Sequence, residues 1–391
     1  MSGAPANDRA GGAATAASAF RLLVVMNGCL ADRTHSIGGG DLVLFKFIRH
    51  CRTPPDILIP ASAQEFVPAA GRRFLTLRNW GLSVPGILAV FLVRTAQGVW
   101  RAWRNRQVYD VALASSPFGV EVLPLWCWKA RHKGAVIYHV LPKRKAVSLS
   151  TWLRFGLAAL EQRVTLKLID RACDFVVAGN AHTRQQLQAR MPHKTYFVLP
   201  AGFDAAAIDR VPAPPKDPNL ACFVGRLVSQ KGIFELLKVM AAIARYKPAF
   251  RLVLAGTGPE REAFVTGMQR LKLDNIQLAG FVSEAEKIAL LKKSAFFFFP
   301  SFEEGWGIAL AEALYCECRC VCYELPHYRS SFGELPVYAR LGEPEDFVRA
   351  FQASGPVPAD QKSRMRRYDD PQVAAQLLEH LRAVAQRPPA H

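Results

Sequence analysis

Short apolar segments recur along the chain, and longer stretches with helical character separate them. They lie at 21–26, 56–60, 111–115, 135–140, 175–178 and 196–199, and again at 221–225, 251–255, 276–279, 295–299 and 319–323. Short runs rich in Val, Ile, Leu and Phe are typical of parallel strands that are covered on both faces. Their alternation with helices predicts a doubly wound α/β architecture.

A proline cluster divides this pattern into two halves. The stretch 204–218 contains Pro212, Pro214, Pro215 and Pro218, and proline removes backbone donors and disfavours a preceding helix. We therefore predict two Rossmann-like lobes that face each other across a cleft, where ligands of open α/β sheets bind. The predicted parts are a disordered tail over 1–19, a first lobe over 20–205, a second lobe over 206–370 and a terminal helix over 371–391 that packs back on the first lobe.

The composition indicates a globular protein with a positive surface. Of the 391 residues, 50% are hydrophobic and 21% are charged, and the formal net charge is +18. Such a charge attracts polyanions, which include nucleic acid, anionic lipid and phosphorylated substrates. No nucleic-acid-binding module is recognisable, so we expect no nucleic-acid partner.

Cysteine usage and hydropathy indicate where the protein works. The nine cysteines are odd in number and irregular in spacing, which is typical of a reducing, cytoplasmic setting. Residues 1–18 are rich in Ala and Gly and lack the basic and apolar regions of a secretory signal. The uncharged stretch 80–93 is shorter than the roughly 20 apolar residues that a spanning helix needs, so we predict no transmembrane helix.

A basic loop follows the first apolar run of the second half. Gly225 and Arg226 end that run, and Lys231 and Gly232 precede a predicted helix. Two cations beside a helix N-terminus, at the carboxyl edge of a sheet, suit a diphosphate. The alternative is a solvated loop with two ordinary basic residues.

An acidic, glycine-containing turn follows the Phe-rich run at 295–299. Glu304 lies in the turn and Glu312 lies in the predicted helix after it; at about 100° per residue, both can face one cleft. The backbone N–H groups of Gly305, Trp306 and Gly307 lie at the helix start, where they can meet a phosphate. The alternative is a capping carboxylate at Glu304 and a helix-face salt bridge at Glu312.

Together these two motifs resemble the family 4 retaining glycosyltransferases, which have the GT-B fold. The resemblance rests on Gly-Arg and Lys-Gly within 225–232 and on the E-x(7)-E spacing of Glu304 and Glu312. Between them, 254–260 is similar to the family's Gly-x-Gly-Pro loop. The segment that ends at Val282 is similar to the one whose backbone receives the nucleotide base. The resemblance covers most of 20–385 and is strongest over 220–326.

The first half is similar to the family more loosely, but in the same order. Gly39 and Gly40 belong to a glycine-rich loop, which allows close approach of the backbone to phosphate. In the family, the corresponding loop faces the donor diphosphate across the cleft. His139 lies in a segment that resembles the family's strand end near the transferred sugar. On its own, His139 would be interpreted as an ordinary half-buried histidine.

The resemblance implies a retaining transfer of a hexose from a nucleoside-diphosphate sugar to a saccharide or lipid-linked saccharide, in polysaccharide or glycolipid biosynthesis. It implies that Arg226 and Lys231 stabilise the departing diphosphate, and that Glu312 binds the ribose. Glu304 and His139 would be the catalytic residues, with Glu304 holding the sugar hydroxyls. In the family no enzymic nucleophile is clearly required, so the resemblance implies that Glu304 is a positioning group rather than a nucleophile. A two-carboxylate glycosidase mechanism would need a second carboxyl across the bond, and no candidate for it is evident. No cofactor is implied.

The sequence departs from the family pattern after the second motif. Glu317 and Arg319 stand where the family usually has a small residue and a proline. The run 316–322 alternates four cysteines, which in a strand would place all four thiols on one face. Structural zinc sites normally use C-x(2–4)-C pairs, so we predict that these thiols fill the core and that the protein binds no metal.

Basic residues lie beside aromatic residues in two segments of the first half. They are Arg94, Arg101, Arg104 and Arg106 around Trp100 and Trp103, and 143–145 before a stretch with Trp152, Leu153, Phe155 and Leu157. Such patterns are typical of helices that lie on anionic lipid. The alternative is a pair of amphipathic helices packed on the sheet with basic outer faces. The net charge favours peripheral contact with an anionic membrane, at the inner face of the cytoplasmic membrane.

Two other classes of function share parts of this pattern. A GT-B-fold epimerase would change a free sugar nucleotide without an acceptor, and a phosphorylase would use free phosphate and, in a large class, pyridoxal phosphate, for which no lysine is well placed. A non-catalytic pair of lobes would bind a sugar nucleotide or act as a scaffold. Such a scaffold would not need the two cations and the two carboxylates together. The sequence leaves the sugar, base, acceptor and linkage open.

Overall fold

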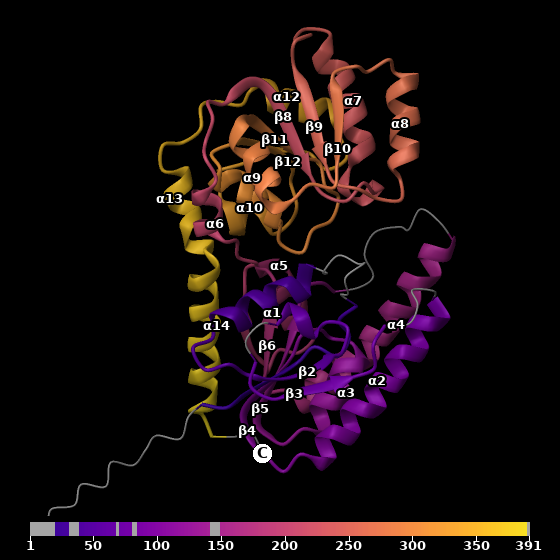
Figure 1. The fold of residues 1–391 in the computed structure, drawn as a ribbon, viewed down its shortest axis with the longest axis vertical. Helices are drawn as coiled ribbons and strands as arrows, with labels where there is room; N and C mark the ends of the chain where they lie inside the picture. Colours follow the sequence, from indigo (N-terminus) through magenta and orange to yellow (C-terminus); the bar gives the residue numbers. More distant parts are fainter. Residues whose placement is uncertain (1–19, 31–38, 68–69, 80–83, 141–148, 389–391) are drawn as a thin grey trace, which may run out of the picture.

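The protein folds into two α/β lobes that follow each other along the longest axis of the molecule (Figure 1). The computed structural model describes residues 20–30, 39–67, 70–79, 84–140 and 149–388. Each lobe is built on one parallel sheet with helices around it. This architecture confirms the predicted pair of Rossmann-like lobes.

The sheet of the first lobe has seven parallel strands in the order β3-β2-β1-β4-β5-β6-β7. The chain order reverses between β1 and β4, which is the place where doubly wound sheets open a crevice for ligands. The strands are β1 (Leu22–Val25), β2 (Asp56–Pro60), β3 (Arg73–Thr76), β4 (Tyr109–Ala114), β5 (Ala130–Ile137), β6 (Phe175–Ala178) and β7 (Thr195–Val198). The helices are α1 (Gly39–His50), η1 (Gln64–Phe66), α2 (Val84–Arg104), α3 (Gly119–Cys127), α4 (Leu149–Ala172) and α5 (Ala181–Gln188).

The sheet of the second lobe has six parallel strands in the order β10-β9-β8-β11-β12-β13. Here the order reverses between β8 and β11, so the loops after these two strands meet at one edge. The strands are β8 (Asp217–Val224), β9 (Arg251–Ala255), β10 (Ile276–Gly280), β11 (Ser294–Phe299), β12 (Arg319–Tyr323) and β13 (Val337–Ala339). The helices are α6 (Ala205–Arg210), η2 (Ser229–Lys231), α7 (Ile233–Ala244), α8 (Arg261–Arg270), α9 (Glu284–Lys293), α10 (Ile308–Tyr315), α11 (Tyr328–Phe332), α12 (Pro344–Gln352), α13 (Gln361–Met365), η3 (Arg366–Tyr368) and α14 (Asp370–Ala385).

Most strands lie where the apolar runs predict them, and β2, β6, β9 and β12 have the predicted bounds. The pattern does not predict β3 and β13, which lie at the outer edges of their sheets. The residues of β3 are polar at both ends and β13 has only 3 residues, so neither strand gives an apolar run of four or more. The predicted linker over 204–218 is too long, because it contains α6 and because β8 already begins at Asp217 and includes Pro218.

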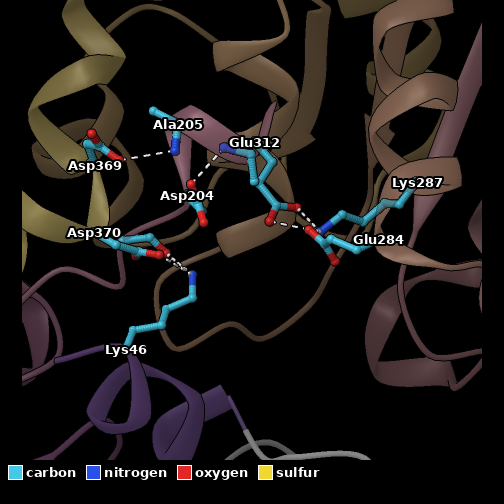
Figure 2. Close-up of polar contacts among 10 residues, drawn as sticks. Lys46, Asp204, Ala205, Glu284, Lys287, Glu312, Asp369 and Asp370 are labelled. Atoms are coloured by element: carbon cyan, nitrogen blue, oxygen red, sulfur yellow. Dashed lines mark hydrogen bonds and ion pairs between the residues drawn. The ribbon is translucent and has the colours of Figure 1, made fainter. Parts of the chain in front are cut away.

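Two segments pass between the lobes and pair with each other. Phe203 and Asp369 form an isolated parallel bridge. The N–H of Phe203 donates to the Tyr368 carbonyl at 3.0 Å, and the N–H of Asp370 donates to the Phe203 carbonyl at 2.9 Å. The Asp369 carboxylate accepts from the N–H of Ala205 at 3.0 Å (Figure 2). The two crossings are therefore tied together at the junction of the lobes.

The last helix, α14, runs along the side of the first lobe (Figure 1). It packs against α1, β4 and β5, and its Leu377 and Leu381 side chains are buried. At its N-terminus, the Asp370 carboxylate lies 3.2 Å from Nζ of Lys46, which also donates to the Gly202 carbonyl at 2.9 Å. An ion pair and an apolar face thus hold this helix on the first lobe.

Only two of the four alternating cysteines lie in a strand, although all four side chains belong to one apolar core cluster. Cys320 and Cys322 lie in β12, whereas Cys316 follows the end of α10 and Cys318 lies in the turn before the strand. The pattern misleads because β12 begins only at Arg319. All four side chains are free thiols buried in the apolar core, and burial raises the pKa of each. They fill the core as small apolar groups.

Candidate active site

The basic loop of the second lobe follows β8 at the carboxyl edge of the sheet. Arg226 is exposed, and its guanidinium forms no hydrogen bond or ion pair within the described part of the chain. The short helix η2 ends at Lys231, and Gly232, with φ of +69°, begins α7. A Cβ at position 232 would lie 2.0 Å from the Pro300 carbonyl oxygen, so glycine is required where these two loops meet.

The loop after β9 packs against this basic loop. Gly256 has φ of +141°, and a Cβ there would lie 1.9 Å from the Gly225 carbonyl oxygen. The Ser229 hydroxyl donates to the Glu260 carboxylate. These contacts hold the backbone that carries Arg226 and Lys231 in place. They do not involve the side chains of these two basic residues.

The acidic turn between β11 and α10 brings a carboxylate to the basic loop. Nζ of Lys231 lies 2.5 Å from Oε1 of Glu304, whose side chain is 10% exposed. The two residues are 73 positions apart, and they meet because β8 and β11 are neighbours in the sheet. A carboxylate accepts hydroxyl protons while an ammonium attracts phosphate oxygens, so the pair can hold two different parts of one ligand.

At the start of α10, backbone N–H groups are available to a ligand, whereas the Trp306 side chain is not. The indole is 4% exposed and packs on Phe332 and Tyr368, with ring centroids 5.0 and 4.9 Å away. Gly307 has φ of +105° and begins the helix. Trp306 therefore anchors the turn that contains Gly305, and the helix N-terminus is left to meet a negative charge through main-chain N–H groups.

Glu312 is buried and ion-paired. Nζ of Lys287, on α9, lies 2.8 Å from the Glu312 carboxylate and 2.7 Å from that of Glu284 (Figure 2). Burial opposes the charge of Lys287, but the two carboxylates outweigh it and raise its pKa. Lys287 is not among the site residues predicted from the sequence. The signal that could have indicated it is its place one turn into the helix that follows Val282. Val282 itself is half-buried in the loop between β10 and α9.

The first lobe meets the acidic turn through two polar side chains. Nδ2 of Asn180, the N-cap of α5, donates to the Gly305 carbonyl at 2.7 Å. His139 follows β5, and a Cβ at position 305 would lie 3.1 Å from its Nε2. The structure thus brings His139 and the loop that carries Glu304 together across the cleft. Asn180 is a further contact that the sequence analysis did not single out as a site residue.

The predicted glycine-rich loop lies mostly outside the described residues, apart from its last positions. Gly39 and Gly40 form the start of α1. A Cβ at position 40 would lie 3.0 Å from the ring of Tyr138, the neighbour of His139. The N-terminus of α1 is therefore close to the histidine segment, at the carboxyl edge of the first sheet.

Buried charged groups hold the segment that follows β1. Arg94, fully buried on α2, donates to the carbonyls of Asn27 at 3.3 Å, Cys29 at 3.1 Å and Leu77 at 2.8 Å. On the other side, Oε1 of Glu121 accepts from the N–H of Gly28 at 3.1 Å. The expectation that Arg94 belongs to a basic surface is wrong, because its guanidinium is used to satisfy loop carbonyls inside the lobe.

Arg94, Glu121 and the half-buried Asp41 of α1 have shifted pKa values. Burial raises the pKa of Glu121 to about 7 and that of Asp41 to about 6, against hydrogen bonds from Ser115 and Cys29 that favour the charged forms. Burial lowers the pKa of Arg94 to about 10. Within the described residues, none of the three forms an ion pair of its own. No cluster of three His, Cys, Asp or Glu side chains in that part of the chain is placed to hold a metal ion.

Comparison with known proteins gives this geometry a context. Residues 204–350 match the family model described as "Glycosyl transferases group 1". The second lobe carries a Glycosyl transferases group 1 domain. The match spans the basic loop, the acidic turn and the Glu312 helix, and the first lobe lies outside it.

Individual relatives agree with this assignment. The chain is 27% identical over 155 residues to the "Uncharacterized glycosyltransferase YqgM" of Bacillus subtilis, covering 39% of this chain and 42% of the relative. It is 26% identical over 179 residues to the "GDP-mannose:cellobiosyl-diphosphopolyprenol alpha-mannosyltransferase" of Xanthomonas campestris, covering 42% and 47%. The chain thus spans less than half the length of these curated relatives.

A solved structure shows the same fold over nearly the whole chain. HepE of Anabaena, crystallised with UDP, superposes with a TM-score of 0.70 at 16% identity, covering 93% of this chain and 100% of that one. Both parallel sheets with their helices match, so the two lobes have the GT-B arrangement of glycosyltransferase structures.

Proposed function

We propose that this protein is a retaining glycosyltransferase that moves a hexose from a nucleoside-diphosphate sugar to a saccharide or lipid-linked saccharide, in polysaccharide or glycolipid biosynthesis. The observation that carries the proposal is the contact between Lys231 and Glu304 at the cleft edge of the second lobe, opposite His139 of the first. The family of the second lobe and the fold of the whole chain support it.

The diphosphate of the donor occupies the basic loop. Arg226 is exposed and unengaged, and Lys231 is half-buried beside it. The backbone N–H groups at the start of α10 face the same cleft edge. As the bond between the sugar and the diphosphate breaks, negative charge grows on the leaving phosphate, and fixed cations stabilise that charge more than they stabilise the bound donor.

The transferred sugar lies between the two lobes. Glu304 accepts hydrogen bonds from its hydroxyl groups, and the ion pair with Lys231 keeps the carboxylate ionised and in place. His139 contacts the sugar near its reacting carbon from the opposite lobe. Because each lobe supplies one of these contacts, the site is complete only when the lobes are as close as in this structure.

The nucleoside part of the donor extends towards α9. The ribose hydroxyls donate to Glu312, and Lys287 neutralises that carboxylate in its buried position. The base lies against the backbone at Val282. The donor thus extends along the carboxyl edge of the sheet, from the loop after β11 past those after β8 and β9 to the loop after β10.

The chemical step needs no enzymic nucleophile. The acceptor oxygen bonds to the anomeric carbon on the face that the diphosphate leaves, and the leaving phosphate oxygen takes the acceptor proton. The configuration is then retained. Glu304 and His139 act by orienting the sugar, because the ion pair with Lys231 lowers the nucleophilicity of the Glu304 carboxylate.

A lipid-linked acceptor fits a relative whose name contains a diphosphopolyprenol-linked saccharide. Together with the positive charge of the chain, it supports peripheral contact with an anionic membrane, at the inner face of the cytoplasmic membrane. The surface that makes this contact is distinct from the cleft in which the transfer takes place.

The test is a turnover assay with a panel of nucleoside-diphosphate sugars and short saccharide or polyprenyl-diphosphate saccharide acceptors. We expect nucleoside diphosphate release that requires an acceptor, and a product whose anomeric proton coupling in NMR matches that of the donor. Conversion of the free donor sugar without any acceptor would identify an epimerase instead. Inversion at the anomeric carbon would overturn the proposed mechanism.

A further inference from the structure

The outer face of α2 is apolar along its whole described length. Four large side chains recur at helical spacing on this face, with Leu92 and Trp103 most exposed, at 73% and 75%, and Leu88 and Trp100 about half exposed. The small residues Ala89 and Ala96 between them are exposed as well. A monomeric globular protein rarely leaves such a continuous apolar stripe in water, so the stripe marks an interaction surface.

The opposite face of α2 holds the helix in the fold. Val90, Arg94, Gly98 and Ala102 are buried at intervals of four residues, and Arg94 binds three loop carbonyls. Helix α2 also packs against α3. The outer stripe is therefore not needed for folding, and its apolar character is left without a structural explanation.

The charges of α2 complement an anionic surface. The helix contains no Asp or Glu, and its only charged residues besides buried Arg94 are Arg101 and Arg104 in the last turn. The Arg104 guanidinium lies 4.8 Å from the centre of the Trp100 ring. Tryptophan and arginine together at one end of an apolar helix suit the headgroup region of a bilayer, where the indole is half apolar and the guanidinium meets phosphate.

Helix α4, on the same side of the first lobe, also exposes apolar and basic side chains. Helix α3 packs against both α2 and α4, and Figure 1 shows α2 and α4 on the side of the first lobe away from α14. On α4, Leu160 and Val164 are more than half exposed, with Arg163 and Lys167 exposed beside them. Helix α4 thus exposes apolar and basic side chains of the same kinds as α2.

We propose that the α2 stripe is a membrane-docking surface that inserts into the headgroup region of an anionic bilayer, with α2 parallel to the membrane plane. Leu88 and Leu92 reach the acyl boundary, Trp100 and Trp103 lie at headgroup depth, and the arginines bind lipid phosphates. No helix in the described part of the chain has the length and hydropathy needed to cross a bilayer, so the contact is peripheral. A second copy of the chain is disfavoured, because it would bring two surfaces of like charge together.

The α2 stripe supplies a surface for the peripheral membrane contact of the proposed function and in that respect rests on it, but vesicle binding tests the stripe without donor or acceptor. We would compare flotation of the purified chain with vesicles of phosphatidylcholine alone and with vesicles in which about a third of the lipid is phosphatidylglycerol. We expect binding to the anionic vesicles that falls at least tenfold in the double variant Leu92→Glu/Trp103→Glu. The matched control is Tyr246→Glu/Leu271→Glu, which changes two exposed apolar residues of the second lobe and should leave binding unchanged.

A second measurement uses the unaltered protein. Lipids brominated near the headgroup should quench part of the tryptophan fluorescence in anionic vesicles, and Trp103→Phe should reduce the quenched fraction. Equal vesicle binding by the stripe variant and the unaltered chain would overturn the proposal. So would absence of quenching, or a dimer in solution that the stripe variant dissociates. Transfer activity on a water-soluble acceptor reports separately on the proposed function.

Discussion

The two lobes handle buried charge in opposite ways. In the second lobe, each buried site carboxylate has a lysine: Glu304 pairs with Lys231 and Glu312 with Lys287. In the first lobe, Glu121 and Arg94 are buried and bind backbone groups instead of each other. The second lobe therefore keeps charges that a ligand can use, whereas the buried charged groups of the first lobe hold the residues directly after β1 in place.

The largest expected effect is on activity in the second lobe. Lys231→Ala should lower kcat by roughly 10²–10³-fold, because it removes a cation from the leaving diphosphate and leaves Glu304 buried without its partner. The matched control is Lys238→Ala, a lysine of α7 that is 60% exposed and pairs with Glu235. If initial rates with saturating donor are equal in the two variants, Lys231 is not part of the site.

The next effect is on stability in the first lobe. Arg94→Met keeps much of the side-chain length but leaves several buried carbonyls without donors, so we expect a loss of about 3 kcal/mol in the free energy of unfolding. Arg106→Met, at an exposed position, should stay within about 0.5 kcal/mol of the parent chain. Urea unfolding measures both. A similar stability for the two variants would show that the buried guanidinium does not hold the loop.

The pH dependence of stability sharpens the comparison further. Burial raises the pKa of Glu121 from an ordinary 4.5 to about 7. The folded state therefore holds this proton more tightly, so the contribution of Glu121 to stability is fully present below pH 4.5 and is lost as the pH rises through about 7. Glu121→Gln should flatten the stability profile between pH 5 and 7 and stabilise the protein by about 1–2 kcal/mol at pH 8. An unchanged slope in urea titrations across this range would contradict this.

The smallest effect concerns donor affinity. Glu312→Gln should raise the donor KM about tenfold with a smaller change in kcat, because one charged hydrogen bond to the ribose is lost while the diphosphate contacts stay. Glu324→Gln, an exposed carboxylate of the same lobe paired with Arg329, serves as the control. A fall in kcat at unchanged KM would place Glu312 in the chemical step instead of in nucleoside binding.

The fold can be predicted from local sequence patterns, but the site can be predicted from them only in part. Runs such as 251–255 are bounded by turn residues, so their strands can be predicted to the residue. The partnership of Lys231 with Glu304 depends on which strands are neighbours, which spacing along the chain does not reveal. Arg94 shows the same limit: its sequence neighbours indicate a basic surface, but three carbonyls from other segments draw it inside.

The first lobe is harder to predict for a physical reason. Its contacts with the site are single side chains such as Asn180 and His139. These residue types occur on many protein surfaces, so they do not indicate a site by themselves. The glycine-rich segment of this lobe lies mostly outside the described residues. In the second lobe, by contrast, Gly232 and Gly256 are required by close backbone approaches, so the residues themselves signal the loops. Chemistry that depends on backbone geometry leaves a clearer mark in a sequence than chemistry that depends on one side chain.

The central claim, that the second lobe holds a nucleoside diphosphate through its basic loop, is tested most directly by calorimetric titration of the purified chain with UDP, GDP and ADP. We predict that one of them binds with micromolar affinity, that Arg226→Ala/Lys231→Ala weakens binding at least a hundredfold, and that Lys238→Ala/Arg245→Ala does not. No binding of any nucleotide at millimolar concentration, or equal binding by both double variants, would contradict the account.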